Sequence, residues 1–165
     1  ALIASKEVLN AEIVICLLGP GIVGPGTEYG FTGVEQGEII NTVSLLGGKP
    51  IAIPRISFAD KRERHIGVSH HSATSLGKVA LKKAIVPIPV LPKEKMEKIY
   101  SDFTNSGILE KHSIVERKAE NAIILAKNLK LPLSTMGRNY EKDPEFFLTA
   151  AAAGIVAAEL TNNEG

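Results

Sequence analysis

The feature that most constrains the fold is a regular alternation, along the whole chain, of short apolar runs and stretches with helical spacing. Such an alternation is typical of strands joined by crossover helices, which form a parallel sheet covered by helices. We therefore expect an α/β fold with a three-layer, mostly parallel, Rossmann-like sheet of about five strands and helices on both faces. The expected strands span residues 12–18, 50–56, 84–90, 113–116 and 131–135.

Two of these runs carry further information. Residues 12–18 are apolar on both faces, as in a central parallel strand, and Cys16 within them is expected to behave as a small buried hydrophobe. In residues 84–90, Pro87 and Pro89 place both missing N–H groups on the same side of the strand. This spacing predicts an edge strand.

Helices are expected where apolar residues recur on one face between start and stop signals. The predicted helices span residues 32–46, 92–106, 118–129 and 143–160. Thr32 and Glu35 match a capping box at the start of the first one. The last one has almost no side-chain bulk over residues 150–154, so it can lie close against the sheet or against a second copy of the protein. A homo-oligomer through this Ala-rich helix is therefore considered.

Composition narrows the class of protein. With 165 residues, the chain is long enough to form a single α/β domain over residues 1–165 without metals or disulfides. Its 19 basic and 18 acidic side chains leave a net charge of +1, which argues against a nucleic-acid partner. The sequence lacks both a signal peptide and an apolar run of about 18 residues, so we expect no membrane partner and a cytoplasmic protein. Without an initial Met, we expect either a processed chain or a part of something longer.

Ligands of an open parallel sheet bind beyond the carboxyl ends of its strands, and this rule selects three loops. The first is glycine-rich and directly follows residues 12–18, so its backbone N–H groups can approach an anion. It matches neither a P-loop nor the dinucleotide fingerprint, and the alternative is a rigid connection. The candidate ligand-binding residues of this glycine segment are Gly19, Gly21, Gly24, Gly26 and Thr27.

The second loop, residues 55–72, holds three of the four histidines and three arginines. Ser69 can cap a helix that begins at His70, which would place His70 and His71 at a positive helix end and favour neutral rings. Adjacent helical residues diverge by about 100°, so at most one ring is expected to face the glycine segment. The alternative is a solvated, charge-alternating loop. The candidate catalytic residues are His70, His71 and Asp60, and the candidate ligand-binding residues are Arg55, Arg64, His65 and Ser69.

A metal site is the other interpretation of this loop, with His65, His70, His71 and Asp60 as ligands for zinc, iron or manganese. The spacing matches no recognised ligand pattern, so no metal and no particular cofactor is predicted. The third loop contributes Ser134, Thr135 and Arg138 as candidate ligand-binding residues, unless Arg138 only pairs with Glu141 or Asp143. The fourth histidine, His112, is expected to be structural.

Several segments together resemble one protein family. They are residues 19–24, 55–60, 64–65, 67–71, 134–138 and 143–147. Over about residues 12–158 the chain is similar to an uncharacterised bacterial family known only as a domain of unknown function. The resemblance implies that the chain is the later part of a longer protein, and it implies no activity. The chain departs from the family pattern at Lys61, where proline is usual, and at Ile66, where arginine is usual.

These observations lead to one leading function and one alternative. The leading hypothesis is a cytoplasmic hydrolase or transferase that binds an anionic small molecule, a phosphorylated or carboxylated metabolite, with His70 or His71 as acid or base. Arg55, Arg64 and Arg138 would hold the charged group. The alternative is a non-catalytic ligand-binding or assembly domain.

Overall fold

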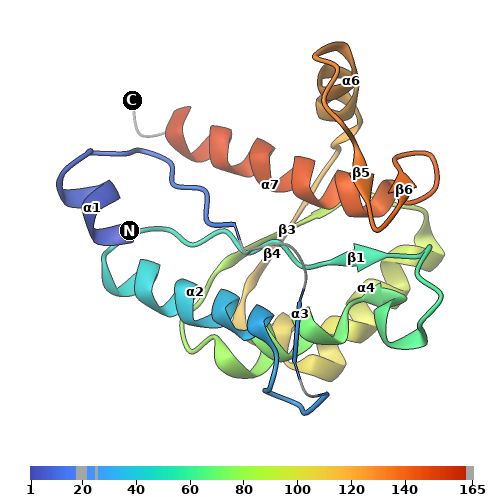
Figure 1. The fold of residues 1–165 in the computed structure, drawn as a ribbon, viewed down its shortest axis with the longest axis horizontal. Coiled ribbons are helices and arrows are strands. Elements are labelled where there is room, and N and C mark those ends of the chain that lie inside the picture. Colours follow the sequence, from blue (N-terminus) through green and yellow to red (C-terminus); the bar gives the residue numbers. More distant parts are fainter. Residues whose placement is uncertain (18–21, 25, 163–165) are drawn as a thin grey trace.

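The computed structural model describes residues 1–17, 22–24 and 26–162 (Figure 1). Its helices are α1 (Leu2–Glu7), α2 (Glu35–Leu45), α3 (His70–Thr74), α4 (Lys93–Ser106), α5 (Ile108–Lys111), α6 (Glu120–Asn128) and α7 (Pro144–Asn162). Short 3-10 turns cover Thr32–Val34 and Glu63–His65, and a π-helical turn over Ser75–Val79 continues α3. Its strands are β1 (Ile56–Ser57), β2 (Gly67–Val68), β3 (Ile85–Pro89), β4 (Ser113–Arg117), β5 (Ser134–Thr135) and β6 (Arg138–Asn139).

The expected Rossmann-like sheet of about five strands is wrong. The described residues form a helix-rich fold with three two-stranded sheets. Only β3 and β4 pair in parallel, from Ile85 with Ser113 to Pro89 with Arg117, and these two strands agree with the sequence prediction. The other two sheets are the antiparallel hairpins β1–β2 and β5–β6.

The prolines of β3 explain why the sheet stops there. Ile85 donates its N–H to the carbonyl oxygen of Pro50 at 2.9 Å, and Ala52 donates to the carbonyl oxygen of Ile85 at 2.8 Å. The next two N–H positions on this side of β3 belong to Pro87 and Pro89, which have no hydrogen to donate. Pairing with the predicted strand 50–56 therefore ends after a single bridge, and the predicted edge is confirmed.

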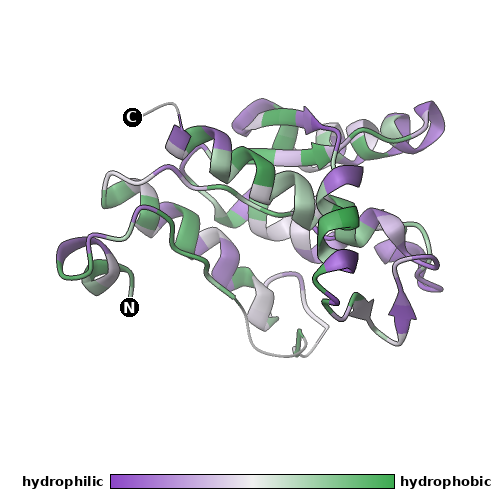
Figure 2. Cartoon of the chain, turned by 90° about the horizontal axis from the view of Figure 1, so that it is seen from above, coloured by the Kyte–Doolittle hydropathy of each residue, from purple (hydrophilic) through white to green (hydrophobic). Residues whose placement is uncertain are grey.

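The predicted first strand is also wrong where the structure describes it. Residues 12–17 form no strand, and Leu18 lies outside the described residues. Ile15 and Leu17 are 78% and 86% exposed, and Cys16 is exposed rather than buried. These apolar residues lie in the segment near the N-terminus (Figure 2). Strand-like composition alone did not produce a strand, because no other described segment pairs with this one.

The helix predictions are confirmed, although one capping detail and the last predicted strand change. Gly107 has a φ of 77° and ends α4, as the sequence predicts. The capping box does not form, because the Thr32 hydroxyl accepts from the Val23 N–H at 3.2 Å instead. The predicted strand 131–135 reduces to β5, so the third loop is itself part of a hairpin.

Two apolar clusters hold the fold together. The larger one joins Val86 and Ile88 of β3 to Ile99 and Phe103 of α4, together with Leu76 of the π-helical turn. The smaller one joins α6 and α7. In Figure 1, α7 lies above β3 and β4, and α2, α3 and α4 lie below them. The loop of residues 55–72 runs between these two layers and is held by both.

Helix α7 has two faces. Ala152, Ala153 and Val156 belong to the buried side. Along the side toward α6, Gly154 borders an apolar groove of about 420 Å³. Within the described part of the chain, α7 alone is long and apolar enough to cross a membrane, and 39% of its most apolar 18-residue stretch is buried in the fold. The absence of a membrane partner and the packing of this helix against a second copy stay predictions.

Gly37 lies inside α2, where α2 packs on the π-helical turn, and Gly154 lies inside α7. Substituting each of them tests how closely these helices pack. A Cβ on Gly37 would lie 2.7 Å from the Ser75 carbonyl oxygen, whereas none of the described atoms lies within 4 Å of a Cβ on Gly154. Gly37→Ala is therefore expected to lower the free energy of unfolding by about 1–3 kcal/mol. Gly154→Ala is expected to raise it by up to about 1 kcal/mol through helix propensity. Urea denaturation of both variants checks this, and equal effects would contradict the packing of α2 on the π-helical turn.

Candidate functional site

The loop of residues 55–72 folds back on itself because its two ends pair. Ile56 pairs with Val68 and Ser57 with Gly67 in the β1–β2 hairpin. Beyond the hairpin, the Ser69 N–H donates to the Arg55 carbonyl oxygen at 2.9 Å. Ser69 then caps α3, as predicted, because its hydroxyl accepts the N–H of His71. The start of α3 is therefore held against Arg55 and against the residues between the two strands.

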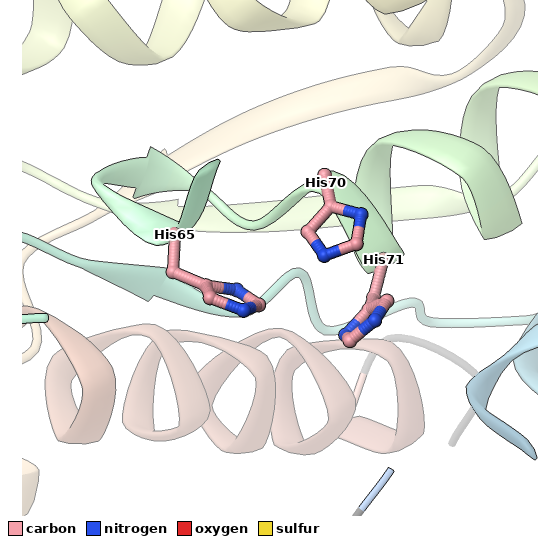
Figure 3. Close-up of side chains that lie close together, drawn as sticks. All are labelled: His65, His70 and His71. Atoms are coloured by element: carbon pink, nitrogen blue, oxygen red, sulfur yellow. The ribbon is translucent and has the colours of Figure 1, made fainter. Parts of the chain in front are cut away.

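This folding brings three histidines together. His65 lies in the 3-10 turn before β2 and is 1% exposed, while His70 and His71 occupy the first turn of α3. The ring centroids lie 4.9 Å apart for His65 and His70, 5.3 Å for His65 and His71, and 4.0 Å for His70 and His71. Figure 3 shows the three rings turned toward one another. One ligand nitrogen of each lies within 4.8 Å of the other two.

Each of these rings has a buried nitrogen without a hydrogen-bond partner in the described structure. The three atoms are His65 Nε2, His70 Nε2 and His71 Nδ1. Buried polar atoms are nearly always satisfied, and an unsatisfied one costs about 1–3 kcal/mol. The Phe31 ring covers His71 with a centroid distance of 4.5 Å and gives it no polar partner. Three such atoms at one place need a bound water, ion or other ligand to satisfy them.

All three rings are held in the neutral form. Burial, aided by the charges of Arg62 and Arg55, lowers the pKa of His65 from 6.5 to about 4. Burial and the neighbouring His70 lower the pKa of His71 to about 4. Burial also lowers the pKa of His70, helped by Arg64. Neutral imidazoles have a free lone pair at pH 7, which is the form that binds metals.

The other ring nitrogen of His65 is held by two groups. Its Nδ1 lies 2.8 Å from the Ser69 hydroxyl and 3.3 Å from Arg55 Nη1. When Nδ1 carries the proton, it donates to the hydroxyl, and Nε2 is left as a free acceptor toward His70 and His71. When Nε2 carries the proton, Nδ1 accepts from Arg55 and Ser69. The first tautomer suits a metal ligand.

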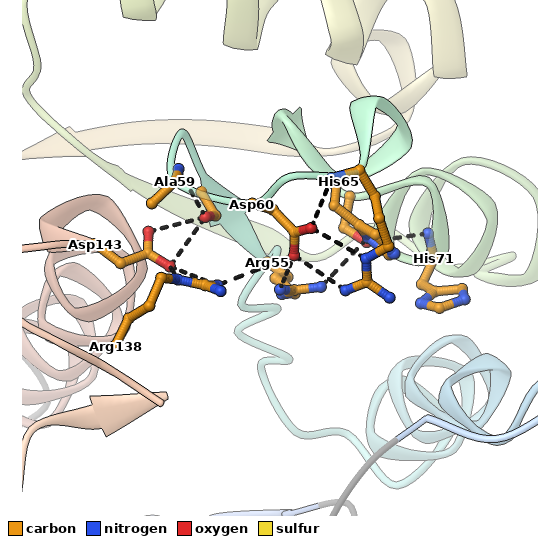
Figure 4. A network of polar contacts seen from close by, with 10 residues as sticks. Arg55, Ala59, Asp60, His65, His71, Arg138 and Asp143 are labelled. Carbon is orange, nitrogen blue, oxygen red and sulfur yellow. Dashed lines mark hydrogen bonds and ion pairs between the residues drawn. The ribbon is translucent and has the colours of Figure 1, made fainter. Parts of the chain in front are cut away.

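Asp60 is occupied by arginines. Arg62 donates to both of its carboxylate oxygens at 3.0 Å, and Arg55 donates to one of them at 2.9 Å (Figure 4). The hydrogen bond from Arg62 holds the pKa of this carboxyl far below its ordinary 3.8. Asp60 lies beside the histidines as a permanently charged counter-ion. These contacts favour a positioning role over that of acid or metal ligand.

The same network reaches the start of α7. Arg138 donates to Asp143 at 2.9 Å, which is one of the two pairings that the sequence offered, and Asp143 also accepts from Ser57. Arg138 Nη2 lies 3.9 Å from Asp60 and so joins the third loop to the second. Ser134 and Thr135 pair across the β5–β6 hairpin and are not part of this network.

In the described part of the glycine segment, the contact with the site comes at its end. Gly19 and Gly21 lie outside the described residues. A Cβ on Gly24 would lie 1.7 Å from the Gly30 carbonyl oxygen, and Gly26 has a φ of 79°. Thr27 accepts the N–H of Gly30 at 3.1 Å. The described part of the segment is thus folded on itself, and Phe31, directly after it, contacts His71.

Two residues of the site escaped the sequence analysis, and one histidine was assigned correctly. Arg62 was signalled only by its place two residues after Asp60, and nothing in the sequence singled out Phe31. His112 is structural, as predicted. Its Nδ1 accepts the N–H of Ala84 at 3.1 Å, and its Nε2 lies 2.9 Å from the Leu76 carbonyl oxygen.

The lowered pKa values predict how stability depends on pH. The unfolded chain binds protons at His65 and His71 near pH 6.5, whereas the folded chain binds them only near pH 4. The free energy of unfolding of metal-free protein should therefore hold above about pH 7 and fall as the pH drops from 6.5 to 4. Urea denaturation across this range checks it. The double variant His65→Gln, His71→Gln should show a shallower fall, and an unchanged slope would contradict the burial of these rings.

Comparison with known proteins gives a family but no function. No curated protein and no solved structure matches the chain. A family model described as "Protein of unknown function (DUF3866)" matches residues 1–154, which include the three histidines and the arginines around them. The resemblance to a family of unknown function is confirmed: the chain belongs to the DUF3866 family.

Proposed function

We propose that this protein is a metal-dependent hydrolase whose metal ion is bound by His65, His70 and His71. Two observations carry the proposal: one ring nitrogen of each histidine lies within 4.8 Å of one from each of the other two, and each ring has a buried nitrogen without a hydrogen-bond partner. A metal ion would satisfy all three at once. A buried water, which can make about three hydrogen bonds, is the alternative occupant, and the metal titration below distinguishes the two.

The donor set selects the class of metal. Three imidazole nitrogens suit zinc, copper, nickel or cobalt, whereas magnesium, calcium and manganese prefer oxygen ligands. Asp60 is the carboxylate that lies nearest to His65 in the network, and its oxygens are engaged by Arg55 and Arg62. We therefore propose zinc, or a similar late transition metal, bound without a carboxylate.

The geometry fits such an ion after a small movement. Metal–nitrogen bonds of about 2.0 Å in a tetrahedral site place the nitrogens about 3.3 Å apart. The rings, now within 4.8 Å, would draw together by rotating about their side-chain bonds. Three protein ligands leave the fourth position of a tetrahedral ion for water, which is the arrangement of catalytic rather than structural zinc.

That open position supplies the reaction. A zinc ion held by three histidines lowers the pKa of bound water to about 7, so hydroxide is present at neutral pH. Attack of this hydroxide on the electrophilic carbon or phosphorus of an ester would form the new bond to oxygen and break the bond to the leaving oxygen. The leaving group would keep the electron pair and take up a proton. Water is the only co-reactant.

Ser69 would be a positioning residue of this site. In the metal-binding tautomer its hydroxyl would accept the Nδ1 proton of His65 and leave Nε2 for the metal, and the same oxygen caps the helix that carries the other two ligands. One buried hydroxyl thus contacts the His65 ring directly and holds the start of the helix that carries His70 and His71. Second-sphere partners of this kind commonly change metal affinity by about 10–100-fold.

Metal titration tests the proposal directly. The protein should bind about one zinc or cobalt ion per chain, and bound cobalt should show the strong visible absorption of a tetrahedral site. His71→Gln should lose this binding while keeping its folded circular dichroism spectrum. Cys16→Ser is the matched control, because it removes the one cysteine, an exposed soft ligand outside the site. Substoichiometric metal, or equal binding by His71→Gln, would overturn the metal site.

Turnover is the second arm of this test. The metal-loaded protein should hydrolyse activated aryl esters or aryl phosphates faster than the metal-free protein, and His71→Gln should remove the difference. Stoichiometric metal with no metal-dependent hydrolysis of any such ester would support binding and refute the hydrolase.

A further inference from the structure

The parallel sheet has one edge that no described segment covers. The Ser113 N–H and the Arg117 carbonyl oxygen both bond to the β3 side of the sheet. In a parallel ladder alternate residues face the same neighbour, so Ile114 and Glu116 turn their N–H groups away from β3. In the described part of the chain β4 pairs with no other strand, and neither of these N–H groups donates to a backbone carbonyl. The outer edge of β4 is therefore open to a further strand.

The sequence of β4 does not protect this edge. The other edge of the sheet is blunted by Pro87 and Pro89 of β3, whereas β4 contains no proline. The side chain of Glu116 accepts a hydrogen bond from Tyr100 of α4 at 2.6 Å, so it is held along one face of the sheet. The Glu116 carbonyl oxygen accepts from Arg117 Nη1 at 2.9 Å and keeps a second lone pair.

The chain also contains a strand-like segment without a partner. Five of the six residues over 12–17 are apolar, and three of these are β-branched, a composition that favours strands. Ile13, Val14, Ile15 and Leu17 are 42–86% exposed. Within the described residues the backbone of this segment forms no hydrogen bond. Contiguous apolar residues that stay this exposed are typical of an interaction surface.

Two hydrogen bonds hold this part of the chain beside α2. Ahead of the segment, Lys6 Nζ donates to the carbonyl oxygen of Leu46 at 2.7 Å, directly after the end of α2. Beyond the segment, the Thr32 N–H donates to the Val23 carbonyl oxygen at 2.9 Å, just before α2 begins. Residues 12–17 lie between these two anchors, on the side of the molecule that α2 occupies.

That side is opposite to the open edge of β4. Gln36 of α2 donates to the carbonyl oxygen of Ile53 at 3.0 Å, so α2 lies beside residues 50–53. Ile51 bridges Ile85 on the side of β3 that faces away from β4. The order across the sheet is therefore residues 50–53, then β3, then β4. One copy of the protein presents the segment and the open edge in opposite directions.

We propose that residues 12–17 of one copy of this chain add as a strand to the open edge of β4 in a second copy. Main-chain hydrogen bonds would supply the pairing, and the exposed apolar side chains would be covered on the faces of the extended sheet. Because each copy presents one segment and one edge on opposite sides, the contact is head-to-tail and can repeat. This assembly does not depend on the proposed metal site.

Analytical ultracentrifugation of the full chain tests the assembly, under reducing conditions that keep Cys16 from forming an intermolecular disulfide. The unmodified protein should sediment as a monomer at low concentration and as dimers and longer chains as the concentration rises. Glu116→Pro removes an outward N–H and leaves the bonds to β3 in place, so the same association should need about tenfold more protein or greater. Glu116→Ala is the matched control, because it also loses the Tyr100 contact but keeps the N–H. It should associate as the unmodified protein does.

The segment has a variant of its own. The double variant Val14→Pro, Ile15→Pro removes two neighbouring N–H groups, which point to opposite sides of a strand, so it weakens the pairing in any register. Because both residues are exposed, this variant should keep the circular dichroism spectrum of the folded protein. It decides the question by itself if Glu116→Pro does not fold.

A mixture of the two variants identifies the contact. The double proline variant keeps an intact edge and Glu116→Pro keeps an intact segment, so together they should form a one-to-one dimer that cannot grow longer. An unmodified protein that stays monomeric at every concentration would overturn the proposal. Equal association of Glu116→Pro and Glu116→Ala would also overturn it, as would undiminished association of the double proline variant or a mixture of folded variants that forms no dimer.

Discussion

The ion pairs on Asp60 are the interaction on which the site depends. This buried carboxylate holds Arg55 from the start of the β1–β2 loop and Arg62 from within it, and it faces Arg138 from the next hairpin. Breaking a buried pair of this kind leaves an uncompensated charge and costs far more than losing a surface pair. Because Arg55 also contacts His65, the position of the first histidine is tied to this one carboxylate.

The three histidines affect the stability of the fold in the opposite direction from the ion pairs on Asp60. Their burial keeps them neutral, and in the described chain one nitrogen of each is left without a hydrogen bond. Such groups destabilise a folded protein unless a ligand satisfies them. An arrangement that costs stability without a ligand and gains it with one is typical of functional sites.

The sequence predicted local structure well and the sheet poorly. Helical spacing and stop signals gave α2, α4, α6 and α7, and Ser69 was recognised as a cap, because these features depend on neighbours in the chain. The sheet failed because pairing depends on distant partners. Pro87 and Pro89 were read as an edge but not as the reason for a sheet of only two full strands. The loop of residues 55–72 was correctly selected. The divergence of about 100° between adjacent helical residues led us to expect at most one ring facing the glycine segment, whereas His70 and His71 both turn toward His65.

The close spacing of the three proposed ligands along the chain bears on the role that a bound metal ion would have. His65, His70 and His71 lie within seven consecutive residues, so a bound ion closes only a short loop. The entropy removed from the unfolded chain grows with the length of the loop that is closed, so an ion bound here would constrain little of the unfolded chain. The two apolar clusters and the Asp60 network already position the loop. An ion that closes so short a loop and leaves one position open would be suited to chemistry rather than to cross-linking the fold.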